Sequence, residues 1–177
     1  MSADASSSTG SPFWRFSLRF YRQPKVADAC IALQEEAGID VNLLLFLLWQ
    51  ATLKRALSPI EVGELEGRIG AWRNATVIPL RSVRRALKSP PALVEPATAE
   101  AFRTRIKAVE LEAERLQQEA MYEIARASPF GREAASAPDA ARNNVAVYAT
   151  IAPAPFPKAA IETLLTAFAG LEHKPEE

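Results

Sequence analysis

The stretch VNLLLFLLWQATLKRA, residues 41–56, decides the fold class of this 177-residue chain. No charged residue interrupts the run from Leu43 to Trp49, so a helix built from it is apolar on nearly every side. Seven residues are far fewer than the roughly 20 that a helix needs to cross a bilayer. The stretch therefore predicts a helix that other helices surround, with Asp40 as its N-cap.

The residues before this stretch predict two amphipathic helices. Ser11 as N-cap and Pro12 in the first turn open a helix that runs to about Arg22. A second helix is expected from Pro24 to Gly38. Their apolar stripes are Phe13, Phe16 and Phe20 in the first helix, and Val26, Cys30, Leu33 and Ala37 in the second.

The residues after the stretch begin with a capping box. Ser58, Pro59 and Glu61 have the spacing in which a serine and a glutamate cap the same helix start. Each glycine inside the helix weakens it by nearly ~1 kcal/mol relative to alanine. We expect the compensation to be the close approach of another helix backbone. The apolar face of this helix consists of Val62, Leu65, Ile69 and Trp72. The glycines lie on an adjoining face and are Gly63, Gly67 and Gly70.

Asn74 and Pro79 predict a break in helical structure near residues 74–78, followed by a further helix and a linker at 89–96. A long helix is then expected from Thr98 to about Ala127. Apolar residues recur in it at alternating spacings of four and three, which predicts its buried face. A long bundle helix is a commoner explanation than a coiled-coil seam. The repeat consists of Phe102, Ile106, Val109, Ala113, Leu116 and Ala120.

The rest of the chain predicts a loop at 128–138 and two more helices. One is capped by Asp139 and ends near Ile151, and the other runs from Lys158 to Leu171. The whole pattern predicts an all-α fold, a compact helical bundle of about six core helices plus a C-terminal helical pair. The expected organisation is a disordered segment 1–10, a helical domain 11–127, a flexible loop 128–138, a helical pair 139–171 and a tail 172–177.

Composition limits the classes of partner and the location. Lysine plus arginine and aspartate plus glutamate each number 21, so the chain lacks the excess positive charge of electrostatic nucleic-acid binders. We expect neither sequence-specific nucleic-acid binding nor a membrane segment. Cys30 is the single cysteine, which excludes an internal disulfide and fits a cytoplasmic protein. The start, MSADASSSTGSP, has no basic or apolar region of the kind found in signal peptides.

The residue types that carry most enzyme chemistry are sparse. His173 is the single histidine and lies in the tail, which argues against a nucleophile–histidine pair and against a zinc site. Glutamate pairs at 110/114 and 119/123 have the spacing of a cation site, but a solvated helix face explains them better. We therefore expect no metal, no cofactor and no established catalytic motif.

The stretch VIPLRSVRRALKSPP, residues 77–91, holds the candidate binding residues. Arg81, Arg84, Arg85 and Lys88 fall on one arc of a helix that has no acidic residue of its own. Because like charges at these spacings repel, something acidic should face them. The candidates are a phosphate-bearing ligand, an acidic partner, or the long helix of the same chain through Glu110, Glu112 or Glu114.

A second polar set, Gln34, Asp40 and Asn42, lies near the start of the apolar helix and could form a pocket. A pocket that joins these residues to the arginines would favour an enzyme. A flat, exposed basic ridge would favour an adaptor protein. Packing without a discrete ligand site is a third alternative.

Three stretches in this order resemble an uncharacterised, conserved bacterial family that is common in Proteobacteria: FWRFSLRFY, CIALQEEAGIDVNLLLFLLW and VIPLRSVRRALK. The resemblance covers about residues 13–127. It implies a bacterial cytoplasmic protein and carries no activity, cofactor or catalytic residue. It also implies that the proline-rich region after residue 128 is a lineage-specific extension, which argues against a core role for the last two helices.

The expected function is a non-enzymatic binding or adaptor protein whose arginine-rich helix meets an acidic protein or a phosphate group. The alternative is a small enzyme for a phosphorylated or carboxylated metabolite. In that case the arginines clamp the anion, and Asp40 or a glutamate serves as general base.

Overall fold

The computed structural model describes residues 10–171, and this part of the chain is almost entirely helical, so the all-α prediction is confirmed. His173 lies outside the described residues. Two short strands, β1 (Arg55–Ala56) and β2 (Arg132–Glu133), pair antiparallel. The helices are α1 (Pro12–Tyr21), α2 (Val26–Glu36), α3 (Val41–Thr52), α4 (Pro59–Trp72), α5 (Ile78–Ala86), α6 (Pro96–Ala127), α7 (Ala137–Ile151) and α8 (Lys158–Leu171), with a π-helical turn, η1 (Arg73–Val77), between α4 and α5.

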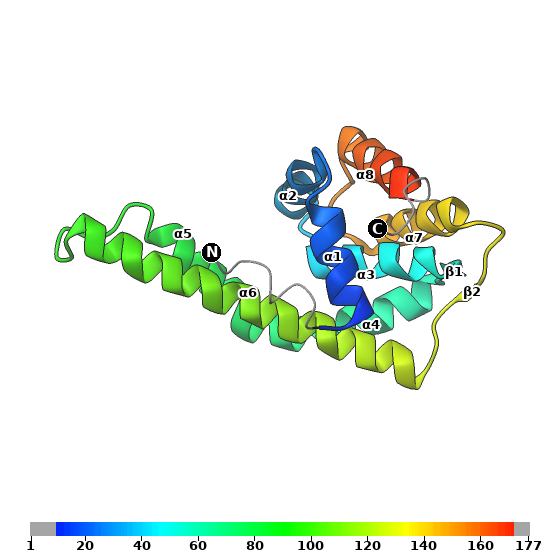
Figure 1. Ribbon diagram of the computed structural model, residues 1–177, viewed down its shortest axis with the longest axis horizontal. Coiled ribbons are helices and arrows are strands. Elements are labelled where there is room, and N and C mark those ends of the chain that lie inside the picture. The colour runs from blue at the N-terminus through cyan, green and yellow to red at the C-terminus, as the bar shows by residue number, and fades with distance from the viewer. Residues whose placement is uncertain (1–9, 172–177) are drawn as a thin grey trace.

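The molecule has two recognisable parts (Figure 1). We call the bundle of α1, α2, α3, α7 and α8 the head. Helix α6 runs along one side of the head and continues well past it, with α5 packed beside its free half. We call this projection, residues 73–110, the arm. The arm and the head meet where the start of α3 faces η1 and the middle of α6.

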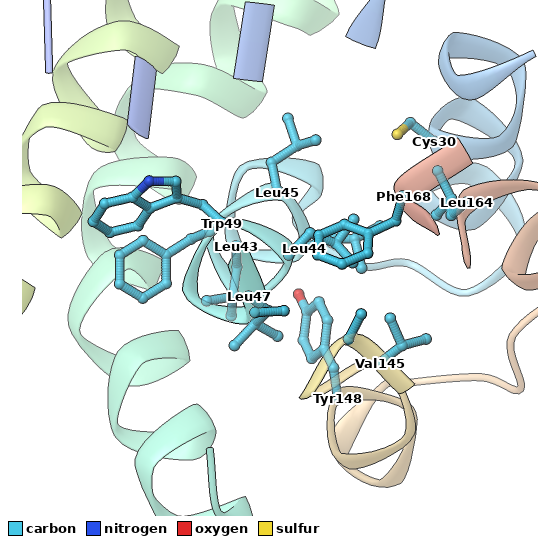
Figure 2. Close-up of a cluster of buried hydrophobic side chains, with 14 of the residues drawn as sticks. Cys30, Leu43, Leu44, Leu45, Leu47, Trp49, Val145, Tyr148, Leu164 and Phe168 are labelled. Carbon is cyan, nitrogen blue, oxygen red and sulfur yellow. The ribbon is translucent and has the colours of Figure 1, made fainter. Parts of the chain in front are cut away.

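Helix α3 is the centre of the head, as its sequence predicts. Leu43, Leu44, Leu47 and Leu48 are fully buried, and Asp40 caps the helix through its side chain. Figure 2 shows Leu43, Leu44 and Leu47 pointing outward from α3 into a shell of side chains from other helices. An uncharged helix of this kind is stable in water only when neighbours cover all of its circumference.

The C-terminal helices belong to that shell, so the expectation of an extension outside the core is wrong. Val145 and Tyr148 of α7 and Phe168 of α8 are each about 2% exposed. Val145 and Tyr148 lie against α3 in Figure 2, and α8 packs on α2 and α7. The physical reason is that α1, α2 and α6 cover only part of α3. Helix α7 packs against the apolar surface of α3 that remains and removes it from water.

The segment before α7 is fixed to the head by several hydrogen bonds. The Ala134 N–H donates to the Lys54 carbonyl at 2.8 Å, and the Gly131 N–H donates to Glu61 Oε1 at 2.6 Å. Gly131 has a φ of +71°, and a Cβ there would lie 2.8 Å from the Ala56 carbonyl oxygen. Only glycine fits this close approach to β1 without strain.

The predicted break at residues 74–78 is wrong, because the chain passes from α4 to α5 without leaving the helical region. The Ile78 N–H bonds to the Arg73 carbonyl, five residues back, as in a π-helix. This wider turn accommodates Pro79, which has no N–H to donate and would crowd the carbonyl four residues before it in a regular α-helix. Helix α4, η1 and α5 therefore form one continuous helical segment, residues 59–86, which we call the rod.

Several predicted helix starts are displaced by a few residues. Helix α2 begins at Val26 rather than Pro24. Helix α6 begins at Pro96 with Glu95 as its cap, before the expected Thr98. Helix α7 is capped by Ser136, whose hydroxyl accepts the Asp139 N–H, so Asp139 lies inside the first turn. In both α6 and α7 a proline near the start places the cap earlier than the sequence prediction did.

Two predicted faces are also wrong. A Cβ at Gly63 or Gly67 would meet nothing within 4 Å, so no helix backbone of the described chain approaches these glycines. On α6, the apolar repeat is largely in solvent, with Phe102 43% and Val109 51% exposed. The buried face of α6 carries polar side chains instead, because its neighbours there are Arg81 and Arg84 of α5 and the polar start of α3, Asp40 and Asn42. These buried polar residues are Glu110, Gln117 and Gln118.

The central place of α3 leads to a stability prediction. Leu48→Ala should lower the free energy of unfolding by about 2–5 kcal/mol, because a fully buried leucine leaves a cavity when truncated. Urea melts measure the loss. A loss below about 1 kcal/mol would contradict the placement of α3.

The placement of α8 can be tested in the same way. Phe168→Ala should cost about 3–5 kcal/mol, since the ring is buried and lies 6.4 Å from the ring of Phe20. The matched control is Leu93→Ala, at a side chain that is 95% exposed. The control should change stability by less than about 0.5 kcal/mol. Equal effects of the two substitutions would mean that α8 is not part of the core.

Candidate functional site

Asp40 lies at the junction of the head and the arm, and both of its carboxylate oxygens are engaged. Oδ1 accepts the N–H groups of Asn42 at 2.8 Å and Leu43 at 3.3 Å, which caps α3. Oδ2 accepts Nε2 of Gln117 at 2.8 Å and Nη1 of Arg73 at 3.3 Å. One buried carboxylate thereby ties α3 to α6 and to η1.

The surrounding polar groups extend this junction. The Asp40 N–H donates to the Tyr148 hydroxyl at 3.0 Å, which adds α7. Asn42 Oδ1 accepts Nε2 of Gln118 at 2.7 Å. Arg73 also pairs with Glu66 at 2.6 Å. Burial opposes the charge of Arg73, but the hydrogen bond to Glu66 and the attraction of both carboxylates outweigh it and raise its pKa.

Two arginines of the α5 stripe, Arg81 and Arg84, face the acidic side of α6, as the intramolecular alternative predicted. Arg81 donates from Nε to Glu110 at 3.1 Å and from Nη2 to Glu114 at 2.8 Å. Arg84 also binds Glu110, through Nε and through Nη2 at 3.2 Å. The third glutamate considered in that alternative, Glu112, pairs with Arg115 of its own helix instead.

The environments of the two glutamates give their pKa values opposite shifts. Burial opposes the charge of Glu110, but hydrogen bonds from Arg84 and Arg81 outweigh it and lower its pKa. Burial raises the pKa of Glu114, and its single bond from Arg81 offsets this only in part. Glu110 is therefore the carboxylate that holds the arm helices together.

The outer two members of the stripe are more exposed. Arg85 pairs with Glu35 of α2 at 3.1 Å, and both side chains are more than half exposed. Lys88 is exposed and makes no ion pair within residues 10–171. The four stripe residues thus divide into two that bind α6, one that bridges to the head, and one without an ion pair in residues 10–171.

A cavity of about 700 Å³ lies between the start of α3 and the η1–α5 part of the rod. It brings Arg81 and Arg85 together with Gln34, Asp40 and Asn42, while Arg84 and Lys88 are not among its lining residues. Sequence reasoning missed four further polar lining residues, which reach the cavity from α2, from the π-turn and from α5. These are Glu35, Arg73, Asn74 and Ser82.

The glutamates considered for a cation have other roles. Glu119 Oε1 accepts the Ser11 N–H at 2.9 Å, and Glu123 pairs with Arg126. Among residues 10–171 there is no group of three or more histidine, cysteine, aspartate or glutamate side chains placed to hold a metal ion. Cys30 is buried, which raises the pKa of its thiol to about 12.

Residues 12–121, more than half of the chain, match a family described as "Protein of unknown function (DUF2390)". The chain belongs to this family. The matched region contains the arm, all of the cavity lining and the centre of the head, and it ends before α7 and α8. No curated protein and no solved structure gave a significant match. Within the described residues, no helix is both long enough and apolar enough to cross a membrane.

The Glu110 ion pairs lead to a prediction about stability and pH. Glu110→Gln should lower the free energy of unfolding by roughly 1–3 kcal/mol near neutral pH, because Arg81 and Arg84 lose their shared charge partner. The contribution of Glu110 is complete above its ordinary pKa of 4.5 and is lost as the pH falls through its lower folded-state pKa. The difference between wild type and variant should therefore shrink below about pH 4.

Urea melts across this pH range measure the effect. The control is Glu123→Gln on the same helix, whose partner Arg126 is mostly exposed. It should change stability by less than about 0.5 kcal/mol. A Glu110→Gln protein as stable as this control would contradict the role of Glu110.

Proposed function

We propose that this protein binds a small anionic molecule, phosphorylated or carboxylated, in the cavity between head and arm. The observation that supports the proposal is the convergence of three arginines on one concave site. Arg73, Arg81 and Arg85 all line it, from η1 and α5. A cavity of about 700 Å³ has the size of ordinary small-molecule sites and is a poor match for a flat protein-docking ridge.

Arg85 is the arginine most readily available to a ligand. Its bond to Glu35 lies in solvent, and an exposed ion pair of this kind contributes about 0–1 kcal/mol. A carboxylate or phosphate in the cavity can therefore replace Glu35. Arg81 keeps Nη1 free of hydrogen bonds to residues 10–171, so it can add a second contact without releasing Glu110 or Glu114.

Neutral polar groups complete the proposed site. Gln34, Asn42, Asn74 and Ser82 line the same cavity and can bind hydroxyl or amide groups of a ligand. The negative charge of Asp40 offsets part of the positive charge of the site, because its carboxylate lies 3.3 Å from Arg73. A ligand that carries one anionic group and several neutral polar groups fits this arrangement better than a polyanion.

An enzyme that acts on such a molecule is the second candidate, because carboxylates line the same cavity as the arginines. Asp40 is a poor general base, since both of its oxygens already accept two hydrogen bonds each. Glu35 is the carboxylate with the freedom to move protons. Its side chain is more than half exposed and is already paired with Arg85, so binding without turnover is the role we favour.

An acidic protein partner and a bacterial, cytoplasmic location also belong to this proposal. Lys88 and the outer side of Arg85 are exposed next to the cavity and could meet an acidic partner. The location is supported by the single, buried cysteine and by the resemblance of the chain to a bacterial family.

Titration calorimetry with inorganic phosphate, sulfate and succinate tests the binding site. At least one probe should bind saturably, and Arg85→Ala should weaken it by roughly 10-fold to 100-fold, because a charge-assisted hydrogen bond is lost. Glu35→Gln should instead tighten binding, since it removes the competing carboxylate. Nuclear magnetic resonance of the recovered probe reports any turnover.

The control is Arg142→Ala, at an exposed arginine that pairs with Asp139 on α7. It should leave the affinity unchanged. Equal weakening in the Arg85 and Arg142 variants would mean that the anions bind through nonspecific attraction. No saturable binding of any probe would contradict an anion site.

A further inference from the structure

Helix α6 carries an apolar stripe that the rest of the described chain leaves in solvent. Phe102, Val109 and Leu116 recur every seven residues and are 43%, 51% and 45% exposed. The stripe spans about 21 Å along the helix. Between them lie Ile106, which is partly exposed, and Ala113, which is buried within the chain, at the spacings of four and three of a two-helix seam.

The neighbourhood of the stripe adds to its apolar area. The indole N–H of Trp72 donates to the Ala113 carbonyl at 3.0 Å, so the Trp72 ring lies along one edge, and this side chain is 40% exposed. The guanidinium of Arg105 lies 5.4 Å from the centre of the Phe102 ring. A row of three large apolar side chains with such flanks is typical of a protein contact surface.

Charges beside the stripe indicate what covers it. Arg105, Glu112 and Glu119 also recur every seven residues, next to the apolar positions on the same edge. The edge is therefore positive at Arg105, in the free half of α6, and negative at Glu112 and Glu119, in the half that lies on the head. Arg105 makes no ion pair within residues 10–171, and the pair of Glu112 with Arg115 is partly exposed. This edge is complementary to itself when the helix direction is reversed.

We propose that two copies of this chain associate through their α6 helices, packed antiparallel along this stripe. In that arrangement Phe102 of one copy lies toward the Leu116 end of the other, and Val109 lies near the two-fold axis. Arg105 of each copy then faces Glu112 of its partner. A parallel arrangement would place basic halves beside basic halves and acidic halves beside acidic halves.

The size of the stripe predicts a reversible dimer. Three large side chains and a few alanines per chain form a smaller surface than obligate dimers bury. The proposal does not depend on the anion site, because the stripe and the cavity are formed by different residues.

Sedimentation equilibrium over a range of concentrations tests the association. The mass should rise from 19.3 kDa toward twice that value as concentration increases. Val109→Lys should weaken association by roughly 100-fold or more, since it places two like charges at the axis. The matched control is Leu111→Lys, at a side chain with the same 51% exposure on another side of α6, and it should associate like the wild type.

Charge reversal and cross-linking test the direction. Arg105→Glu and Glu112→Arg should each weaken the dimer, and the double variant should recover it. Cys30 is fully buried, so introduced cysteines react selectively. An equimolar mixture of Phe102→Cys and Leu116→Cys proteins should cross-link between the two variants, while Phe102→Cys alone should not. A mass of 19.3 kDa at every concentration, equal effects of the two lysine substitutions, or efficient cross-linking of Phe102→Cys with itself would overturn the proposal.

Discussion

The carboxylate of Asp40 accepts four hydrogen bonds, and each pair of them serves a different part of the molecule. Oδ1 satisfies two free N–H groups at the start of α3, while Oδ2 holds Gln117 of α6 and Arg73 of η1. A buried carboxylate is costly unless such donors surround it. The same carboxylate therefore fixes the start of the central helix and the attachment of the arm. If either part moved away, hydrogen-bonding groups of the other part would lose their partner.

The two parts of the molecule are held together by different forces. The head is stabilised by apolar burial around α3, which is strong and has little directional preference. The arm is held by arginine–glutamate pairs and amide hydrogen bonds, which depend on geometry more than on buried area. This difference explains why the arm can line an open, polar cavity, whereas the head is closely packed around α3 (Figure 2).

The π-turn connects this polar packing to the candidate site. It adds a wider turn where Pro79 would otherwise disrupt the helix, and Arg73 and Asn74 lie within it. The turn joins α4, whose apolar face packs in the core, to α5, whose arginines pair with α6. Proline therefore reshapes the helix here without ending it, and the result is a concave surface on one side of the rod.

Local sequence determined the class of fold, most helices and the identity of the central one. The uncharged run from Leu43 to Trp49 and the caps at Ser11, Asp40 and Ser58 needed no tertiary information, because capping and burial of a uniformly apolar helix are local or composition-driven effects. The same reasoning found Arg81 and its partners Glu110 and Glu114, since an uncompensated row of like charges requires acidic neighbours.

Tertiary structure alone decided which face of α6 is buried, what α7 and α8 pack on, and which residues share the cavity. Periodicity assigned the burial of α6 to its apolar residues, yet Glu110, Gln117 and Gln118 are inside and Phe102, Val109 and Leu116 are outside. The reason is that burial depends on what a neighbouring element offers, and here the neighbours offer arginines and the carboxylate of Asp40. The sequence of a helix shows only the pattern of its own side chains. The hydrogen-bond partners that allow a polar face to be buried lie elsewhere in the chain.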